Sequence, residues 1–325
     1  MADRLVTTDR AGAAAPVGRG AGPRHPAGAG EVTDVVVELG GRFRSRGLAE
    51  AFVSAYRAEL ARWPLPVDPL DVAGDYGTTR VQVCGRPTGA PLVLLHGGGC
   101  TSTSWFANVG ALGDAHRVYA PDQIGDAGMS VARGRPIREV GDYMAWLDGL
   151  LDALGLSRAS VCGYSYGAWL ALNYALHRPT RVRRLALLEP TTCFAGLGLA
   201  YLARTCPALA RRSARRVRRV IEWETGRAPL DPSSTALACL GCGEYRGRVS
   251  VTPHPPAPAR IRAMEVPTLV VLAGRARVHD VGRVHTAARG LLADATIRVL
   301  PGARHHFIPI TDAPRLNPEL AGFLR

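Results

Sequence analysis

A serine stands between two glycines in the segment Gly163-Tyr164-Ser165-Tyr166-Gly167. An apolar run at residues 159–162 precedes it and an alanine- and leucine-rich helical pattern follows it, which predicts a strand, a tight turn and a helix. The two glycines allow a turn too sharp for larger side chains. A serine at its apex holds the hydroxyl away from the backbone, where it can act as a nucleophile. Alone, the pattern also fits a serine that caps a helix.

A serine hydroxyl becomes a nucleophile only when a neutral imidazole lies within hydrogen-bond reach. Two candidates, His305 and His306, follow the last apolar strand pattern at residues 296–300. A loop after the final strand can bring one of them to the serine. We favour His305 as the partner of Ser165.

Glycines also follow the apolar run at residues 91–95, in the segment His96-Gly97-Gly98-Gly99. Such a loop lets the backbone approach a ligand closely and turn its N–H groups inward. The N–H groups of Gly98 and Tyr166 could together stabilise an oxyanion. Without the serine, a flexible glycine turn would be the preferred interpretation.

An acidic side chain, Asp122, follows the short apolar run at residues 117–120. Its loop, residues 122–130, contains one further acid, Asp126, and two glycines. Asp122 could be taken for a catalytic acid. We prefer a structural carboxylate that accepts hydrogen bonds from the N–H groups of its own loop.

Strand and helix patterns alternate along the chain, which predicts an α/β fold with a mostly parallel, doubly wound sheet. Residues 81–84 alternate as an edge strand would, and the other expected strands are at 91–95, 117–120, 159–162, 185–188, 268–272 and 296–300. Helices are expected at 47–63, 137–154 and 313–325 and directly after Ser165. The continuous apolar runs indicate strands that are buried on both faces.

Residues 190–265 break this alternation, because they are helical and arginine-rich and then proline-rich. An insertion after the carboxyl end of a strand lies over the ligand site of such a sheet, so we expect a helical cap or lid. The core would then comprise residues 31–189 and 266–325. Residues 1–30, rich in Gly, Ala and Pro, are expected to form a disordered tail.

Composition excludes several classes of protein. The chain has 325 residues, of which 47% are hydrophobic, yet it contains no apolar run long enough to span a bilayer. Its first residues have acids and no apolar segment, unlike a secretory signal. Seven cysteines without a regular spacing indicate reduced thiols and a cytoplasmic protein.

The net charge is +13, and all 40 basic residues are arginines. This excess favours anionic substrates or an acidic partner such as a carrier protein. Seven arginines crowd residues 204–219, either as a solvated helix face or as an electrostatic dock for such a ligand. No nucleic-acid motif is present. The pair Cys239 and Cys242 lacks evident further ligands, so no metal is expected.

Several of these segments together resemble the α/β-hydrolase superfamily, and its carboxylesterase-like members in particular. They are the His96-Gly97-Gly98-Gly99 loop, residues 118–130, the Gly163–Gly167 turn and the late histidine, and the resemblance extends over nearly all of residues 65–325. It implies that Ser165 is the nucleophile, His305 the general base, and the N–H groups of Gly98 and Tyr166 the oxyanion donors. It also implies that no cofactor is needed.

One position departs from the family pattern. Family members usually place the acid of the triad in a turn after the penultimate strand, where this chain has Arg277. A cation cannot orient or stabilise an imidazolium. Glu189, directly after the strand pattern at 185–188, is our first substitute, since some members carry the acid there. Asp280 is the second, although an N-cap role would explain it, and the absence of any acid is the third.

These observations support a serine hydrolase that cleaves an ester, thioester or lactone of a small acyl compound. A non-hydrolytic biosynthetic enzyme on the same fold, such as an acyl transferase, cyclase or lyase, is the first alternative, because one fold hosts many chemistries. A non-catalytic binding protein is the second, and Arg277 is the residue that keeps it open.

Overall fold

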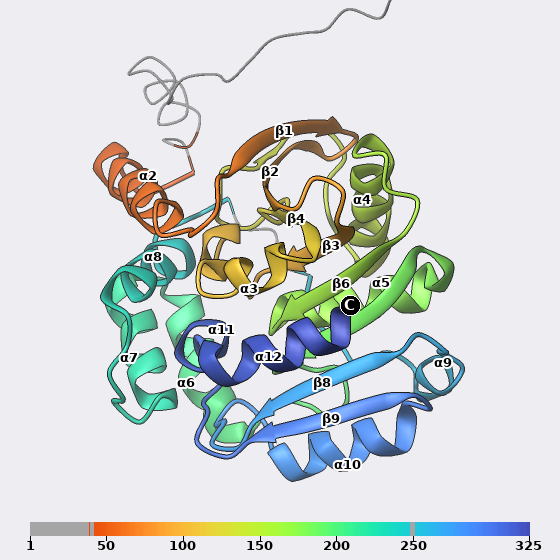
Figure 1. Cartoon of the computed structure of the whole chain (residues 1–325). Helices are drawn as coiled ribbons and strands as arrows, with labels where there is room; N and C mark the ends of the chain where they lie inside the picture. Colours follow the sequence, from red (N-terminus) through yellow and green to blue (C-terminus); the bar gives the residue numbers. More distant parts are fainter. Residues whose placement is uncertain (1–38, 40–41, 248–250) are drawn as a thin grey trace, which may run out of the picture.

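The computed structural model describes residues 39, 42–247 and 251–325 (Figure 1). The tail expected at residues 1–30 lies outside the described residues. The described part is built on a twisted nine-stranded sheet with the order β1-β2-β4-β3-β6-β7-β8-β9, and a short strand β5 pairs with β2. The pairs from β4 to β9 are parallel, and those of β2 are antiparallel. The predicted α/β class with a mostly parallel sheet is therefore confirmed.

The bounds of the strands follow the apolar runs of the sequence closely. They are β1 (Asp68–Gly74), β2 (Gly77–Gly85), β3 (Ala90–Leu95), β4 (His116–Pro121), β5 (Val131–Ala132), β6 (Ala159–Tyr164), β7 (Val182–Leu188), β8 (Thr268–Ala273) and β9 (Ala295–Leu300). The expectation of an edge strand at residues 81–84 is wrong. The edge is formed instead by β1, the hairpin partner of β2, which is largely exposed and carries no apolar pattern. Strand β2 therefore lies between β1 and β4.

Helices cover both faces of the sheet (Figure 1). They are α2 (Arg46–Leu60), α3 (Val109–Gly113), α4 (Val140–Ala153), α5 (Tyr166–His177), α6 (Leu199–Ala210), α7 (Ala214–Glu224), α8 (Pro232–Gly243), α9 (Pro258–Arg262), α10 (Val281–Leu291), α11 (Ile308–Thr311) and α12 (Ala313–Leu324). Two 3-10 turns lie at Ser102–Trp105 and Pro179–Arg181. Among the described residues, none of these helices combines the length and the apolarity that crossing a membrane requires.

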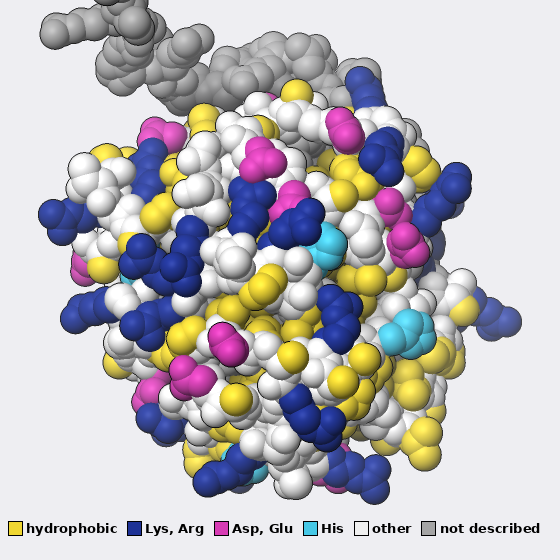
Figure 2. All heavy atoms as spheres, turned by 90° about the vertical axis from the view of Figure 1, so that its right-hand side faces the viewer, with side chains coloured by type: hydrophobic (Ala, Val, Ile, Leu, Met, Phe, Trp, Pro, Cys, Tyr) yellow, Lys and Arg dark blue, Asp and Glu magenta, His cyan; other side chains and the backbone are white. Residues whose placement is uncertain are grey.

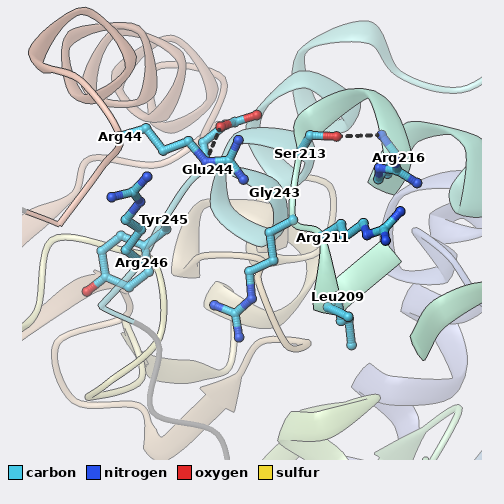
Figure 3. A pocket seen from close by; sticks show the side chains of 11 residues that line it. Arg44, Leu209, Arg211, Ser213, Arg216, Gly243, Glu244, Tyr245 and Arg246 are labelled. Atoms are coloured by element: carbon cyan, nitrogen blue, oxygen red, sulfur yellow. Dashed lines mark hydrogen bonds and ion pairs between the residues drawn. The ribbon is translucent and has the colours of Figure 1, made fainter. Parts of the chain in front are cut away.

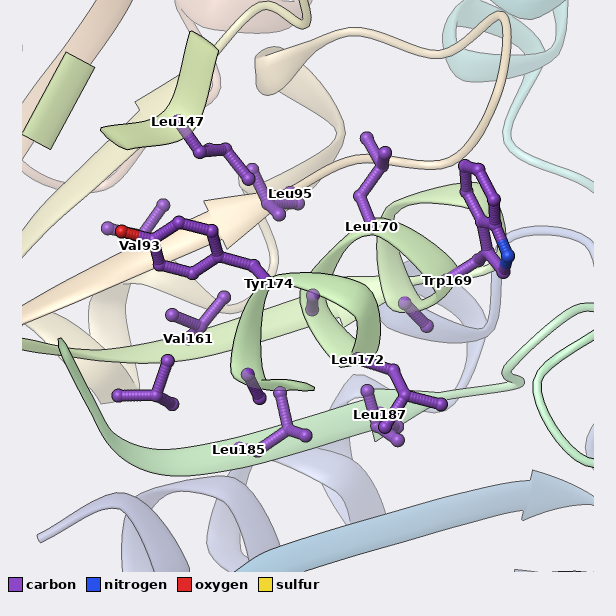
Figure 4. Packing of buried hydrophobic residues seen from close by; sticks show 14 of the residues in the cluster. Val93, Leu95, Leu147, Val161, Trp169, Leu170, Leu172, Tyr174, Leu185 and Leu187 are labelled. Carbon is purple, nitrogen blue, oxygen red and sulfur yellow. The ribbon is translucent and has the colours of Figure 1, made fainter. Parts of the chain in front are cut away.

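The sheet separates two hydrophobic clusters, since successive side chains of a strand point to opposite faces. On one face, Val93 and Leu95 of β3 and Leu185 and Leu187 of β7 pack around α5 (Figure 4). On the other, Leu92 and Leu94 of β3 join residues of α3 and α12. Burial on both faces explains why residues 92–95 of β3 and 185–188 of β7 are all apolar. This packing fixes the carboxyl ends of β6, β7 and β8, where the polar side chains of interest gather.

Residues 190–265 connect β7 to β8 and contain α6, α7, α8 and α9. Beside the sheet, α6 packs against α7, α7 against α8, and α8 against α2 (Figure 1). The short helix α9 differs from them, because Ile261 is buried in the cluster around α5. The chain thus returns to the core before β8 begins.

Candidate active site

Ser165 lies at the junction of β6 and α5, in a backbone conformation that few side chains adopt. Its φ is 54° and its ψ is −114°. A Cβ on Gly163 would come within 2.2 Å of the carbonyl oxygen of Gly167, and a Cβ on Gly167 within 2.2 Å of that of Leu95. Only glycine fits at these two positions. The turn thereby fixes the serine hydroxyl at the carboxyl edge of the sheet, as the sequence pattern predicts.

A continuous chain of hydrogen bonds joins three of the candidate residues. The Ser165 hydroxyl lies 3.0 Å from Nε2 of His305, and Nδ1 of His305 lies 2.9 Å from Oε2 of Glu189. His305 and Glu189 are buried, and their distances are those of direct hydrogen bonds. The structure thus brings together the serine, the favoured histidine and the first of the substitute acids.

Glu189 stands directly after β7 with a φ of 47° and is fully buried. The backbone N–H of Ala273, at the end of β8, donates to its other carboxylate oxygen. Burial raises the pKa of Glu189, but the neighbouring imidazoles of His279 and His305 outweigh that effect and lower the pKa to about 2. The carboxylate is therefore ionised at neutral pH. For His305, burial lowers the pKa and the Glu189 carboxylate partly opposes that shift.

The other positions considered for the acid lie elsewhere. Asp280 is exposed and caps α10, because its carboxylate accepts a hydrogen bond of 2.9 Å from the backbone N–H of Arg283. The guanidinium of Arg277 donates to the carbonyl oxygen of Trp223 and lies over that indole ring, 5.4 Å from its centroid. Neither side chain has a hydrogen bond to His305 among the described residues.

A second buried carboxylate, which the sequence analysis did not identify, supports the histidine loop. Glu224, the last residue of α7, accepts hydrogen bonds from the backbone N–H groups of His305 (3.3 Å), His306 (3.1 Å) and Arg277 (3.2 Å). It also lies 3.0 Å from Nδ1 of His306. Burial raises its pKa, but His306 and His305 together lower it to about 2. The side chains of the two neighbouring histidines thus have different acidic partners. The His306 imidazole contacts Glu224, and the His305 imidazole contacts Glu189.

The backbone around His305 is also held by Tyr164, which precedes the nucleophile candidate. Its hydroxyl donates to the carbonyl oxygen of His305 (2.9 Å) and accepts the N–H of Phe307 (3.1 Å). Phe307 has a φ of 62°, so the loop turns sharply just after the histidine. One side chain of the serine turn therefore positions the histidine loop.

Two further side chains at the site were missed from the sequence, because only the folded loops bring them close. The Thr191 hydroxyl lies 3.0 Å from the Ser165 hydroxyl. The buried His279 approaches the same carboxylate oxygen of Glu189 as His305 does, with its Nε2 3.6 Å from Oε2. Within the described part of the chain, neither ring nitrogen of His279 has a hydrogen-bond partner. No local motif in the sequence marks either residue.

A cavity of about 330 Å³ opens above Ser165. Gly98, Tyr166 and Thr191 line it at the sheet edge. Much of the remaining wall is apolar and comes from α6, α7 and the end of α8, with Tyr201, Ala208, Val217, Val220, Ile221 and Cys242 among its residues, and residues 251–253 also line it. The two proposed oxyanion donors and the serine thus line one cavity.

The loops beneath this cavity are fixed by structural polar contacts. Asp122 is fully buried and accepts the N–H groups of Ser102 and Met129, each at 2.8 Å, and the hydroxyl of Tyr56 at 2.9 Å. It is thus the structural carboxylate that the sequence favoured. Across the described residues, no three or more His, Cys, Asp or Glu side chains are arranged to hold a metal ion.

Comparison with known proteins agrees with this architecture. The family model described as the alpha/beta hydrolase family matches residues 92–317. The carboxylesterase YbfK of Bacillus subtilis (strain 168) is 32% identical over 143 residues, which are 44% of this chain and 48% of that protein. The matches span about half the length of such curated relatives.

Solved structures show the same fold. The naproxen esterase (carboxylesterase NP) from Bacillus subtilis superposes with a TM-score of 0.77 at 24% identity, covering 86% of this chain and 98% of that one. The carboxylesterase CesB (YbfK) of the same organism gives 0.79 at 24% identity, covering 84% and 97%. With the strand order and the serine turn described above, these matches lead to one conclusion. The chain belongs to the alpha/beta hydrolase family.

Proposed function

We propose that this protein is a serine hydrolase of the carboxylic ester type, acting on an ester, thioester or lactone of a small acyl compound. The observation that carries the proposal is the hydrogen-bonded chain from Ser165 through His305 to Glu189 at the floor of the cavity. The partial likeness to bacterial carboxylesterases supports it.

In the first step, Ser165 Oγ attacks the carbonyl carbon while His305 Nε2 accepts the hydroxyl proton. Glu189, ionised and bonded to Nδ1, holds the imidazole in the required tautomer and stabilises the imidazolium. The N–H groups of Gly98 and Tyr166 stabilise the negative oxygen of the tetrahedral intermediate. The imidazolium then protonates the leaving alcohol or thiol as its bond to the carbonyl carbon breaks.

The second step releases the acid. Water enters as the leaving group departs, and His305 accepts a proton from it as the water oxygen attacks the acyl carbon. The second tetrahedral intermediate collapses, and the proton returns from His305 to the Ser165 oxygen. The carboxylic acid leaves and the free enzyme is restored.

In this proposal, residues 190–265 act as a cap that selects the acyl group. The cavity walls from α6 and α7 are formed mainly by apolar side chains, among them Ala208, Val217 and Ile221. Such walls favour a short apolar acyl chain by burying it away from water. The volume of about 330 Å³ limits its size.

The decisive experiment is labelling of the folded protein with a fluorophosphonate, which reacts with activated serines, and mapping of the labelled peptide by mass spectrometry. We expect rapid labelling at Ser165 and hydrolysis of 4-nitrophenyl butyrate. Both should disappear in Ser165→Ala. A Thr191→Ala variant, which keeps the serine, is the matched control and should still be labelled.

Folded protein that neither reacts with the fluorophosphonate nor hydrolyses the ester would contradict the proposal. Labelling together with a stable acyl-enzyme that yields only to added alcohols or thiols would instead indicate an acyl transferase. Either result is read directly from the mass of the peptide that contains Ser165.

A further inference from the structure

A second hollow, of about 480 Å³, lies beside the cavity above Ser165, and five of its eleven lining residues are arginines (Figure 3). Its side chains come from three segments that are distant in sequence. Arg44 precedes α2, Arg211 and Arg216 lie where α6 passes into α7, and Arg246 follows α8. Figure 3 shows these groups around a common space, with Tyr245 beside Arg246.

The charge of this hollow is one-sided. Five arginines line it, and the one acid among its lining residues is Glu244. That carboxylate is already engaged, since it lies 3.4 Å from Arg44 and accepts the backbone N–H of Ala214 at 2.7 Å. Within the described part of the chain, Arg211, Arg212, Arg216 and Arg246 have no ion pair. The hollow therefore keeps an excess of guanidinium groups without a bound carboxylate.

Some arginines elsewhere in the chain are paired with carboxylates. Arg62 makes a bidentate pair with Asp231, with both distances 2.8 Å, and Arg80 makes one with Asp71 at 2.7 Å. On another face of the molecule, basic side chains are scattered among acidic and uncharged ones (Figure 2). Gathering of like charges in a concave space costs free energy through repulsion, unless an anion is bound there.

The hollow also borders the cavity above Ser165. Leu209 and Arg212 line both it and the cavity above Ser165. A substrate whose reacting carbonyl lies at Ser165 would have to pass these two side chains to reach the arginine-lined space. Planar guanidinium groups suit phosphate and carboxylate oxygens, with which they make paired hydrogen bonds.

We infer that the arginine-lined hollow binds a phosphate or carboxylate group carried by the acyl substrate; this rests on the proposed function. The preferred substrates would be esters or thioesters that combine a small apolar acyl segment with an anionic end. The anion lies either on the leaving group or on the far end of the acyl chain. The border that the hollow shares with the cavity above Ser165 favours an anion of the substrate over the surface of an acidic protein.

The first test measures binding without catalysis. Calorimetric titration of inorganic pyrophosphate into the Ser165→Ala protein should show binding at one site. Arg211→Gln/Arg216→Gln should weaken that binding at least about tenfold, because two charged donors are lost. The control Arg215→Gln/Arg219→Gln removes the same charge from exposed positions of α7 that do not line the hollow, and should change binding less than about twofold.

The second test uses substrate pairs to locate the anion. Butyryl-coenzyme A and butyryl-N-acetylcysteamine share the thioester but differ in phosphates on the leaving side. Mono(4-nitrophenyl) adipate and 4-nitrophenyl hexanoate differ in a carboxylate on the acyl side. We expect one anionic member to be preferred in kcat/KM, and that preference to fall about tenfold in Arg211→Gln/Arg216→Gln but not in the control pair.

Absence of pyrophosphate binding to the folded protein would overturn the inference, as would equal effects of the two double variants. If the variants affect only the thioester of an acidic carrier protein, while pyrophosphate does not bind, the arginines form a protein-docking surface and the inference is wrong. Pyrophosphate binding without hydrolysis of any ester would overturn the proposed function but leave the anion site standing.

Discussion

At the scale of single residues, the three groups of the proposed triad differ in how firmly they are held. Glu189 is fixed by His305, by the N–H of Ala273 and by burial, whereas the Ser165 hydroxyl lies equally far, 3.0 Å, from His305 and Thr191. The hydroxyl can donate to His305 while it accepts from Thr191, so both contacts can hold it at once. The acid and the base are held by burial as well, whereas the serine is only half-buried.

The acid of the triad can be tested by two variants. Glu189→Gln should lower kcat by about 10³- to 10⁴-fold, since a neutral amide no longer selects the productive tautomer of His305. Asp280→Asn, which keeps the helix cap, should remain within about twofold of the wild type. Initial rates with 4-nitrophenyl butyrate measure both. A large loss of kcat in Asp280→Asn with little loss in Glu189→Gln would instead place the acid of the triad at residue 280.

The pH dependence of kcat/KM follows from the environment of His305. Burial lowers its pKa below the usual 6.5, and the base must be neutral to accept the serine proton. Activity should therefore rise with pH and reach half its maximum below pH 6.5. In Glu189→Gln the carboxylate that partly raises this pKa is gone, so the midpoint should move to still lower pH. A midpoint above 6.5 in the wild type would contradict this reading.

At the scale of elements, the junction of β6 and α5 depends on backbone contact that no side chain can replace. Gly163→Ala should lower the free energy of unfolding by about 1–3 kcal/mol or more, because its methyl group would meet the Gly167 backbone at 2.2 Å. Gly149→Ala is the matched control: it lies in α4 with nothing within 4 Å and should stabilise by about 0.5–1 kcal/mol. Urea denaturation checks both.

The end of α7 offers a second test, through Glu224. Glu224→Gln should lower stability at pH 7 by about 1–3 kcal/mol, because a charged acceptor of three backbone N–H groups is lost. The pKa of Glu224 is lowered from 4.5 to about 2 by its histidine partners, against the effect of burial. Its contribution is therefore present above pH 4.5 and lost as the pH falls towards 2.

Its control is Glu222→Gln, on the same helix. The Glu222 side chain is 45% exposed, and its ion pair with Arg218, at 3.8 Å, lies on the surface. Loss of this charge should therefore change the free energy of unfolding by less than about 0.5 kcal/mol. Denaturation curves recorded from neutral to acid pH compare the two variants. A Glu224→Gln deficit that stays constant down to pH 3 would show that charge at this position is not what stabilises the loop.

At the scale of the whole molecule, the net charge of +13 acts on every approaching ligand. For an anionic ester, kcat/KM should fall as salt rises from about 20 to about 200 mM, because screening shortens the range of attraction. For a neutral ester of the same acyl chain it should stay nearly constant. Stopped-flow or initial-rate series at constant pH provide the comparison, and equal salt effects on the two esters would rule out steering.

Much of the fold could be predicted because parallel strands that are buried on both faces appear in the sequence as apolar runs, as at β3, β6, β7 and β8. Strand β1 could not be predicted, since its mainly exposed residues carry no apolar pattern. Without β1 in the predicted sheet, β2 was interpreted as an edge strand. Ser165 and His305 could also be predicted, because Ser165 lies in the glycine-flanked turn at residues 163–167 and His305 lies in the loop after the last strand pattern. Thr191, Glu224 and His279 lie in turns or at a helix end, and their approach to the site depends on long-range packing.

The position of Glu224 limits how this molecule can be rebuilt. Exchange of residues 190–265 for the corresponding segment of another hydrolase would look like a simple way to change what it accepts. Yet this segment carries the carboxylate that holds the backbone of His305. A transplanted segment without an equivalent group would leave the proposed base unsupported. The segment proposed to select the acyl group and the proposed catalytic groups are therefore not separable parts, and a working chimera must keep a contact equivalent to that between Glu224 and the His305 backbone.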